Sequence, residues 1–219
     1  MNPVLIADYV LKNMRRDHYA GYDPFDFLNS GVFRFLLLHK SKLIRLAWLQ
    51  IGKRLPINLR PLFLIPKSRN PKGVGLVISG LLHDYHRTGE RQLLDEAREL
   101  AHWLLGERSS PETWGYSCWG YHFDWQARAF YVPAGKPNVI TTCYVARALF
   151  DLGILTGDEV LVGASLDAAR FISCHLYTEV DGRGFYAYIP GESAFVHNAS
   201  LWGAAWCGFA GKRVGDKAM

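Results

Sequence analysis

The chain has 219 residues, of which 49% are hydrophobic and 14% aromatic, and its formal net charge is +5. This composition excludes a disordered protein, and the sequence predicts one domain over residues 1–219. No membrane span or secretory leader is expected, because Asp8 interrupts the first apolar stretch and charged residues interrupt the stretch 33–51.

The first part of the chain predicts helices followed by a connector. Apolar residues recur at helical spacing over 2–16, and further helices are expected over 32–38 and 43–54. Prolines then stand five residues apart, at Pro56, Pro61, Pro66 and Pro71. Because proline removes a backbone donor and restricts the residue before it, segment 55–72 is expected to be an extended connector within the domain.

Charge is distributed unevenly along this part of the chain. From Phe27 to His83 there is no Asp or Glu, whereas segment 34–72 contains ten Lys and Arg residues. Such a stripe could contact anionic lipid, nucleic acid or an acidic polymer, or it could be an ordinary solvated surface. No aromatic–basic nucleic-acid motif accompanies it, so no specific nucleic-acid partner is expected.

A repeated pattern dominates the remainder of the chain. An apolar helix rich in small residues precedes a Thr-Gly-acid turn at 88–90 and 156–158, and a weaker Val-Gly-Asp copy at 214–216. A second helical stretch follows each of the first two turns, LLDEARELAHWLL and VGASLDAARFISCHL. This repetition predicts an all-α array of antiparallel helical hairpins.

Two long segments between the helices, 106–137 and 177–197, are rich in glycine and aromatic residues. Flat aromatic faces beside fixed hydrogen-bonding groups suit sugar rings, so these loops are predicted to form a saccharide-binding cleft. The predicted substrate-binding residues are Trp119, Tyr121, His122, Trp125, Gln126, Arg128 and Asn198.

Asp124 and His197 are the predicted catalytic residues. Asp124 lies between two aromatic residues, where burial would favour the protonated form of a general acid, and His197 could supply a base. The alternative is that the aromatic residues pack between helix ends, while Asp124 caps a helix or pairs with Arg128. Glycoside hydrolysis needs a second carboxylate, for which Glu192 and Asp181 are the candidates, so lyase or epimerase chemistry using His or Tyr remains open.

No cofactor or metal is predicted. His83 and His86 have helical spacing but no third ligand in view, and neither a phosphate loop nor a dinucleotide fingerprint is present. The four cysteines have no close spacing, which favours free thiols in a reducing cytoplasm. An isoprenoid-handling protein is disfavoured because the sequence lacks an Asp-rich diphosphate motif.

Several segments together resemble bacterial proteins of extracellular or capsular polysaccharide biosynthesis. They are GYDPFDFLNS, LPINLRPLFLIPKSRNPKGVGL, CWGYHFDWQARAFYVPAGKPNVITT and VHNASLWGAA, and the likeness extends from about Tyr22 to Ala205. Those proteins belong to the α/α toroids, also called six-hairpin glycosidase-like folds. The resemblance implies a ring of helical hairpins with a saccharide cleft at one end, and relatives include glycoside hydrolases, polysaccharide lyases and sugar epimerases.

The resemblance also bears on whether the ring of hairpins is complete. Related chains continue through further hairpins after the segment that matches VHNASLWGAA, whereas this sequence ends at AGKRVGDKAM. An open ring exposes the apolar flanks of its last hairpins. We therefore expect a truncated toroid or a protomer whose ring is completed by a partner or a second copy. A non-catalytic scaffold or carbohydrate-binding component of a polysaccharide assembly system, peripheral to the membrane, is the alternative function.

Overall fold

The computed structural model describes residues 3–35 and 40–215, and the protein is mostly helical. The chain divides into two compact units. Unit 1 comprises Met1–Asn70 and His122–Tyr131, and unit 2 comprises Pro71–Tyr121 and Val132–Met219. The prediction of one domain over residues 1–219 stays a prediction, and segment 122–131 belongs to the first unit.

Unit 1 contains α1, a short 3-10 helix η1, α2, α3 and the strand β1. Their bounds are α1 Pro3–Arg16, η1 Asp26–Asn29, α2 Gly31–Phe35, α3 Lys42–Arg54 and β1 Trp125–Gln126. The helices predicted over 2–16 and 43–54 are confirmed as α1 and α3. The helix predicted over 32–38 is observed as α2, and residues 36–38 lie outside the described residues.

The predicted connector is observed, but it is not extended throughout, because residues 60–64 form a turn closed by the Ile65 N–H donating to the Arg60 carbonyl oxygen. Residues 55–70, all of them described, form neither a helix nor a named strand. The following helix begins at Pro71 rather than after residue 72. Proline suits the first turn of a helix, where its missing N–H would have no partner in any case.

The core of unit 1 is aromatic. Its buried residues are Phe27, Leu28, Phe33, Leu49 and Ile65. Trp48 stacks on Phe33 with ring centroids 5.2 Å apart, and its indole N–H donates to the Phe27 carbonyl oxygen at 2.9 Å. This bond satisfies the polar edge of a large side chain while its faces remain in the core.

A buried ion pair joins the connector to η1. The Arg60 Nε donates to Asp26 Oδ1 at 2.8 Å, and the two side chains are only 15% and 3% exposed. Burial raises the pKa of Asp26, although Arg60 opposes this shift. Burial of the Asp26 carboxylate is therefore unfavourable by itself, and the ion pair with Arg60 offsets this effect. Asp23 and Asp26 also accept bonds from backbone N–H groups of their own turn, which is the turn role the sequence suggested.

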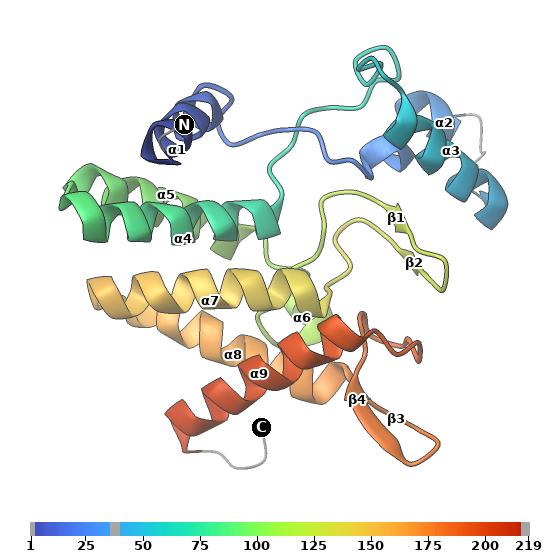
Figure 1. Ribbon diagram of the computed structural model, residues 1–219. Coiled ribbons are helices and arrows are strands. Elements are labelled where there is room, and N and C mark those ends of the chain that lie inside the picture. Colours follow the sequence, from blue (N-terminus) through green and yellow to red (C-terminus); the bar gives the residue numbers. More distant parts are fainter. Residues whose placement is uncertain (1–2, 36–39, 216–219) are drawn as a thin grey trace. The chain divides into compact units, whose positions relative to one another are not determined.

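Unit 2 is built from helical hairpins, as the repeat predicts. Helix α4 (Pro71–Thr88) pairs with α5 (Arg91–Gly106), α7 (Val139–Thr156) pairs with α8 (Glu159–His175), and α9 (His197–Val214) packs on α7 and α8. Within this unit α4, α7 and α9 lie side by side (Figure 1). The long segments between these helices contain α6 (Pro111–Trp114) and a hairpin of the strands β3 (Tyr177–Val180) and β4 (Arg183–Tyr186). The strand β2 (Tyr131–Val132) pairs with β1.

The two Thr-Gly-acid turns close the hairpins in a similar way. In the last helical turn, the Thr88 and Thr156 hydroxyls donate to the carbonyl oxygens four residues earlier. Gly157 then adopts φ 70°, and Asp158 caps α8 by accepting from two backbone N–H groups. In the third copy, Gly215 ends α9 as Gly157 ends α7, and Asp216 lies outside the described residues.

Helix α7 lies at the centre of unit 2. Among the described residues, α7 is the one helix whose length and composition would allow it to cross a membrane. However, 67% of it is buried inside the protein. Such burial is characteristic of the core helix of a soluble protein. Neighbouring backbones approach it closely, and a Cβ added at Gly75 of α4 would lie 3.1 Å from the Tyr144 carbonyl oxygen.

The ion pair gives the first testable prediction. Arg60→Met should lower the free energy of unfolding by about 3–5 kcal/mol at neutral pH, because it leaves a buried carboxylate unpaired. Urea denaturation followed by circular dichroism measures this loss. The double variant Asp26→Asn/Arg60→Met should be more stable than the single variant, and Arg87→Met, at an exposed pair with Asp84, should change little. Equal losses for Arg60→Met and Arg87→Met would contradict the role of the buried pair.

Two glycines of α4 provide a second prediction. Gly75→Ala should destabilise, because overpacking against the α7 backbone costs about 1–3 kcal/mol and outweighs the helix-propensity gain of roughly 0.5–1 kcal/mol. Gly80→Ala meets no atom within 4 Å and should stabilise by that gain alone. Thermal melting compares the two variants, and a shift of the same sign in both would show that the close approach at Gly75 is not limiting.

Candidate functional site

The predicted site residues are divided between the two units. His122, Asp124, Trp125, Gln126 and Arg128 belong to unit 1. Unit 2 holds the remainder, which are Trp119, Tyr121, His197 and Asn198. Each group is therefore described within its own unit.

Trp119 is a core residue of unit 2. It has no exposed surface, and its indole N–H donates to the Leu104 carbonyl oxygen at 2.7 Å. Its backbone N–H donates to the Thr142 hydroxyl of α7. A ring without accessible surface cannot stack on a sugar, so the structure replaces the predicted binding role of Trp119 with a packing role.

Tyr121 joins the two long loops within unit 2. Its hydroxyl lies 2.6 Å from the hydroxyl of Tyr188, and the N–H of Val139 donates to the Tyr188 carbonyl oxygen at 3.0 Å. Burial raises the pKa of Tyr188, and the neighbouring Tyr121 adds to the rise. The hydroxyl pair is therefore a neutral hydrogen-bonding unit at rest, suited to donating to or accepting from a polar ligand group.

Asp124 pairs with Arg34, a partner that was not predicted from the sequence. Its Oδ2 accepts from Arg34 at 2.9 Å, and its backbone N–H donates to the Asn29 side-chain oxygen at 3.2 Å. The same Asn29 oxygen accepts from Arg34. The pairing with Arg128 considered from the sequence is replaced by a pairing with α2, and Asp124 ties segment 122–131 to the helices of unit 1. Its catalytic role stays a prediction.

Gln126 has a structural role beside this cluster. It is buried, its side-chain N–H donates to the carbonyl oxygens of Ala127 and Phe130, and its oxygen accepts from Arg45 at 2.7 Å. All its polar atoms are thus occupied within the protein, which leaves none for a substrate. Arg45 also lies over the Tyr131 ring, 4.6 Å from its centroid, and burial raises the pKa of Tyr131 to about 12.

The other predicted residues of unit 1 differ in exposure. Trp125 is half-buried and makes edge contacts with Phe25 and Phe130, so it extends the aromatic core. Arg128 is exposed near the tip of the β1–β2 hairpin and is free to reach an anionic group. His122 is half-buried, and its Nδ1 is buried without a hydrogen-bond partner among the described residues. Burial lowers the pKa of His122, opposed in part by Asp23.

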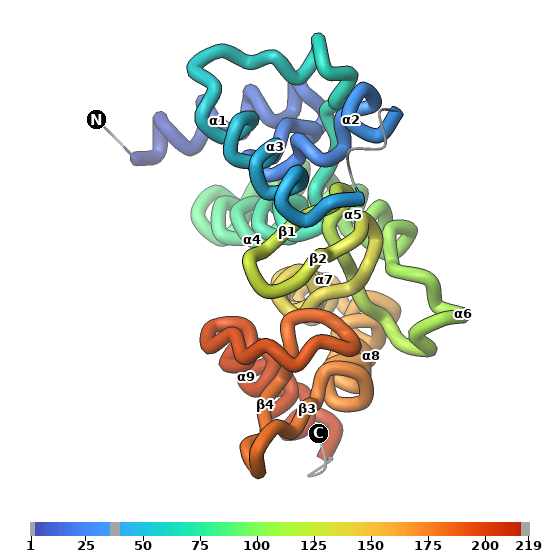
Figure 2. Tube along the Cα trace, turned by 90° about the vertical axis from the view of Figure 1, so that its right-hand side faces the viewer, coloured from blue at the N-terminus to red at the C-terminus, as the bar shows by residue number. Residues whose placement is uncertain are grey.

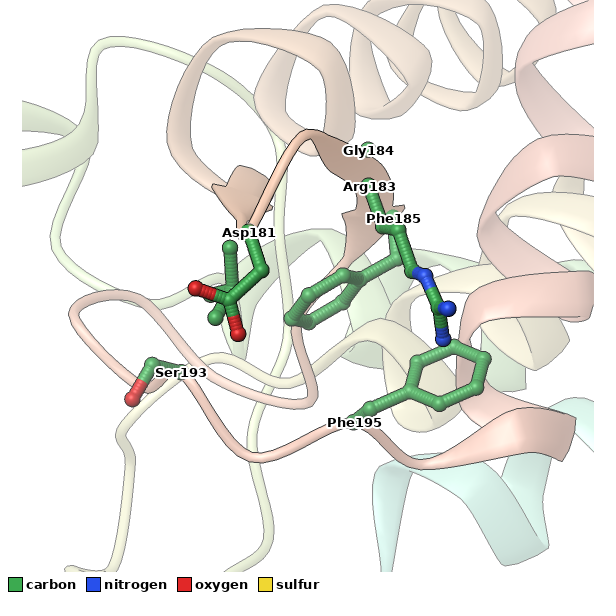
Figure 3. A pocket seen from close by; sticks show the side chains of 7 residues that line it. Asp181, Arg183, Gly184, Phe185, Ser193 and Phe195 are labelled. Atoms are coloured by element: carbon green, nitrogen blue, oxygen red, sulfur yellow. The ribbon is translucent and has the colours of Figure 1, made fainter.

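A cavity lies in the second predicted loop, within unit 2. Its volume is about 590 Å³, and residues from the β3–β4 hairpin and from the following segment line it. Figure 3 shows the Asp181 carboxylate and the Arg183 guanidinium beside the rings of Phe185 and Phe195. The cavity thus combines aromatic faces with a carboxylate, a guanidinium and the Ser193 hydroxyl, which is the chemistry predicted for a saccharide site.

His197 is connected to this cavity through a chain of ring contacts. The Phe185 and Phe195 rings lie 5.1 Å apart, and the Phe195 and His197 rings lie 4.4 Å apart. His197 and Asn198 are both exposed in the first turn of α9. Helix α9 contacts β4 (Figure 2). The structure therefore places His197 one ring away from the cavity, with a face accessible to solvent.

The sequence indicated Asp181 as a candidate carboxylate, but it did not predict the β-hairpin that carries this residue. The hairpin turn that carries Asp181 has φ 52° at Asp181 and 71° at Gly182, a conformation typical of an Asp-Gly two-residue turn. The sequence signal was Asp-Gly between two strand-like runs. The contact between Tyr144 of α7 and Trp202 of α9 was also not predicted: their ring centroids lie 4.9 Å apart with the rings tilted by 39°, and the Lys72 ammonium lies 5.0 Å from the Tyr144 ring centroid. Their positions follow from which helices become neighbours, which periodicity alone does not specify.

Metal and thiol chemistry find little support in the described residues. Across 3–35 and 40–215, no three His, Cys, Asp or Glu side chains gather as metal ligands would. All four cysteines are free; Cys118, Cys143 and Cys207 are buried, and Cys174 is exposed. Burial raises the pKa of Cys118 to about 12, which disfavours a reactive thiolate there.

No protein-family model matches this chain, and a search among curated proteins finds no similar sequence.

The buried imidazole predicts a pH effect on stability. The pKa of His122 is lower in the folded than in the unfolded chain, so the folded state binds a proton less readily. Stability should therefore fall as the pH drops from about 7 to about 5, below the ordinary histidine pKa. Urea titrations across this range should show a weaker pH dependence for His122→Asn than for wild type. His86→Asn, at an exposed histidine, is the control; identical slopes for His122→Asn and wild type would refute the effect.

Proposed function

We propose that this chain is a saccharide-binding or saccharide-processing protein of bacterial polysaccharide biosynthesis, whose cleft is formed by loops 106–137 and 177–197. The observation that carries the proposal is the cavity beside β3 and β4. Phe185 and Phe195 offer apolar faces for the C–H side of a sugar ring, and Asp181, Arg183 and Ser193 offer partners for its hydroxyl groups.

The surroundings of the cavity support the same ligand class. Arg183 could hold a uronate carboxylate through a two-pronged contact. The Tyr121–Tyr188 hydroxyl pair joins the two loops, and the Trp202 ring is 40% exposed one helical turn after Asn198. These groups give an extended ligand several further contacts, as a polysaccharide segment would need.

We also infer that the hairpins belong to an α/α toroid. Unit 2 contains two antiparallel helix pairs, α4–α5 and α7–α8, followed by α9. Helix α7 contacts both α4 and α9. Within unit 2, segment 132–138 leads into the first turn of α7 and segment 187–196 leads into the first turn of α9, and the Tyr188 carbonyl oxygen accepts from the Val139 N–H, so these two segments meet at the start of α7. This is the end at which the resemblance to toroids implies the cleft.

Catalysis is the less supported part of the proposal. Asp181 lies in the cavity, and His197 is one ring contact away, so proton transfer to a sugar by these two groups is geometrically reasonable. Asp124 is held by Arg34 in unit 1. The alternative function is a non-catalytic carbohydrate-binding component of a polysaccharide assembly system, which needs the cavity but no acid–base pair.

A glycan array with purified protein tests the proposal. Wild type should bind at least one class of saccharide, and Phe195→Ala should weaken that binding about two- to tenfold, the equivalent of one aromatic contact of roughly 0.5–1.5 kcal/mol. Tyr9→Ala, an exposed aromatic of unit 1, is the matched control and should bind as wild type. Absence of binding to any glycan would refute the proposal.

The same array separates enzyme from binding component. On any glycan that binds, turnover is measured for wild type, His197→Gln, Asp181→Asn and Asp124→Asn. Unchanged binding with abolished turnover identifies a catalytic residue. Binding without turnover by wild type favours the non-catalytic alternative. Loss of folding stability in Asp124→Asn, without a change in the turnover of the folded fraction, would assign Asp124 to the contact with Arg34 alone.

A further inference from the structure

Positive charge is concentrated in unit 1. This unit contains thirteen Lys and Arg and five Asp and Glu, whereas unit 2 contains twelve and fifteen, so their net charges are +8 and −3. Some of these basic residues are engaged internally, including Arg34, Arg45 and Arg60. Lys40, Lys42 and Arg54 are instead exposed at the two ends of α3.

Helix α3 is apolar on two opposite faces. Its inner face packs on the core through Trp48, Leu49 and Gly52, and a Cβ at Gly52 would collide with the Phe27 ring. Its outer face is formed by Leu43, Ile44, Ala47 and Ile51, all of which are exposed. Leu43 is 78% exposed and Ile51 is 51% exposed. A surface helix of a soluble protein normally carries polar residues there.

The segment that follows α3 has the same character. Ile57, Leu62 and Leu64 are each more than half exposed, and Phe35 at the end of α2 is 85% exposed. No acidic residue occurs between Phe27 and His83. Exposed aliphatic and aromatic side chains beside exposed cations such as Lys42, Lys53 and Arg54 are typical of surfaces that enter the interface of an anionic membrane.

We infer that the outer face of α3 is a docking surface for an anionic lipid bilayer. Leu43, Ile44 and Ile51 enter the boundary between headgroups and acyl chains, while Lys42, Lys53 and Arg54 contact the anionic headgroups. An acidic polysaccharide would satisfy the cations, but the C–H faces of its sugar rings pack on flat aromatic rings, whereas the outer face of α3 is aliphatic. The inference stands on unit 1 and is independent of the saccharide cavity in unit 2.

Vesicle cosedimentation with the full chain tests the inference. The protein should sediment with vesicles of equal parts phosphatidylcholine and phosphatidylglycerol, much less with phosphatidylcholine alone, and less as salt increases. Leu43→Ser/Ile51→Ser should lower partitioning by about tenfold or more, since two side chains lose their apolar burial. Lys42→Glu/Arg54→Glu should lower it similarly on anionic vesicles.

Matched variants of unit 2 provide the controls. Ile154→Ser/Val160→Ser removes apolar groups of comparable exposure, and Arg91→Glu/Lys212→Glu reverses two exposed charges. Both should partition as wild type, apart from a small effect of net charge in the second. Circular dichroism of every variant establishes that it is folded before sedimentation is compared.

Three results would overturn the inference. The first is no sedimentation with anionic vesicles at low salt. The second is equal partitioning of the α3 variants and wild type. The third is a dimer, measured by light scattering, that Leu43→Ser/Ile51→Ser converts to a monomer in the absence of vesicle binding, because the outer face would then bind a second copy. Binding to heparin with no binding to vesicles would likewise assign the cations to an acidic polymer.

Discussion

The burial of α7 on nearly all of its sides is the constraint on which unit 2 depends. A helix enclosed by α4, α5, α8 and α9 needs close backbone approaches and a polar end that is satisfied inside the protein. Glycine supplies the approaches at Gly75 and at Gly203, where an added Cβ would lie 3.1 Å from the Val139 side chain of α7. Asn138, fully buried, satisfies the helix start by accepting from the Thr141 N–H at 2.8 Å.

This buried helix start also positions the loops. The Asn138 N–H donates to the Trp119 carbonyl oxygen, and the Val139 N–H donates to the Tyr188 carbonyl oxygen. Both long loops are therefore anchored to the same turn of α7, and the cavity at β3 and β4 is formed by a segment with a fixed attachment. Rigid support of this kind is what a binding surface on a loop requires, because ordering the loop on binding would otherwise reduce affinity.

The sequence was sufficient for the features that depend on neighbours along the chain. Helices α4, α5, α7 and α8 and their turns follow from apolar periodicity and from glycine after a helix. The sequence did not indicate which residues distant along the chain would contact one another. Asp124 pairs with Arg34, ninety positions earlier, and Trp119 is buried rather than presented, because both outcomes depend on which segments fold together. Aromatic richness in the loop predicted a binding surface, but much of that richness forms the core of unit 1 and the packing of unit 2.

The charge of unit 1 has an energetic consequence for its fold. A compact unit with a net charge of +8 is destabilised by the mutual repulsion of its cations, and its small aromatic core also contains a buried carboxylate that depends on Arg60. Any anionic surface that binds the folded unit more tightly than the unfolded chain would stabilise it by linkage. Lipid binding at α3 would relieve the repulsion and cover the exposed aliphatic face together. The net charge of unit 1 and the exposed aliphatic face of α3 are thus the two features that an anionic bilayer would neutralise and cover.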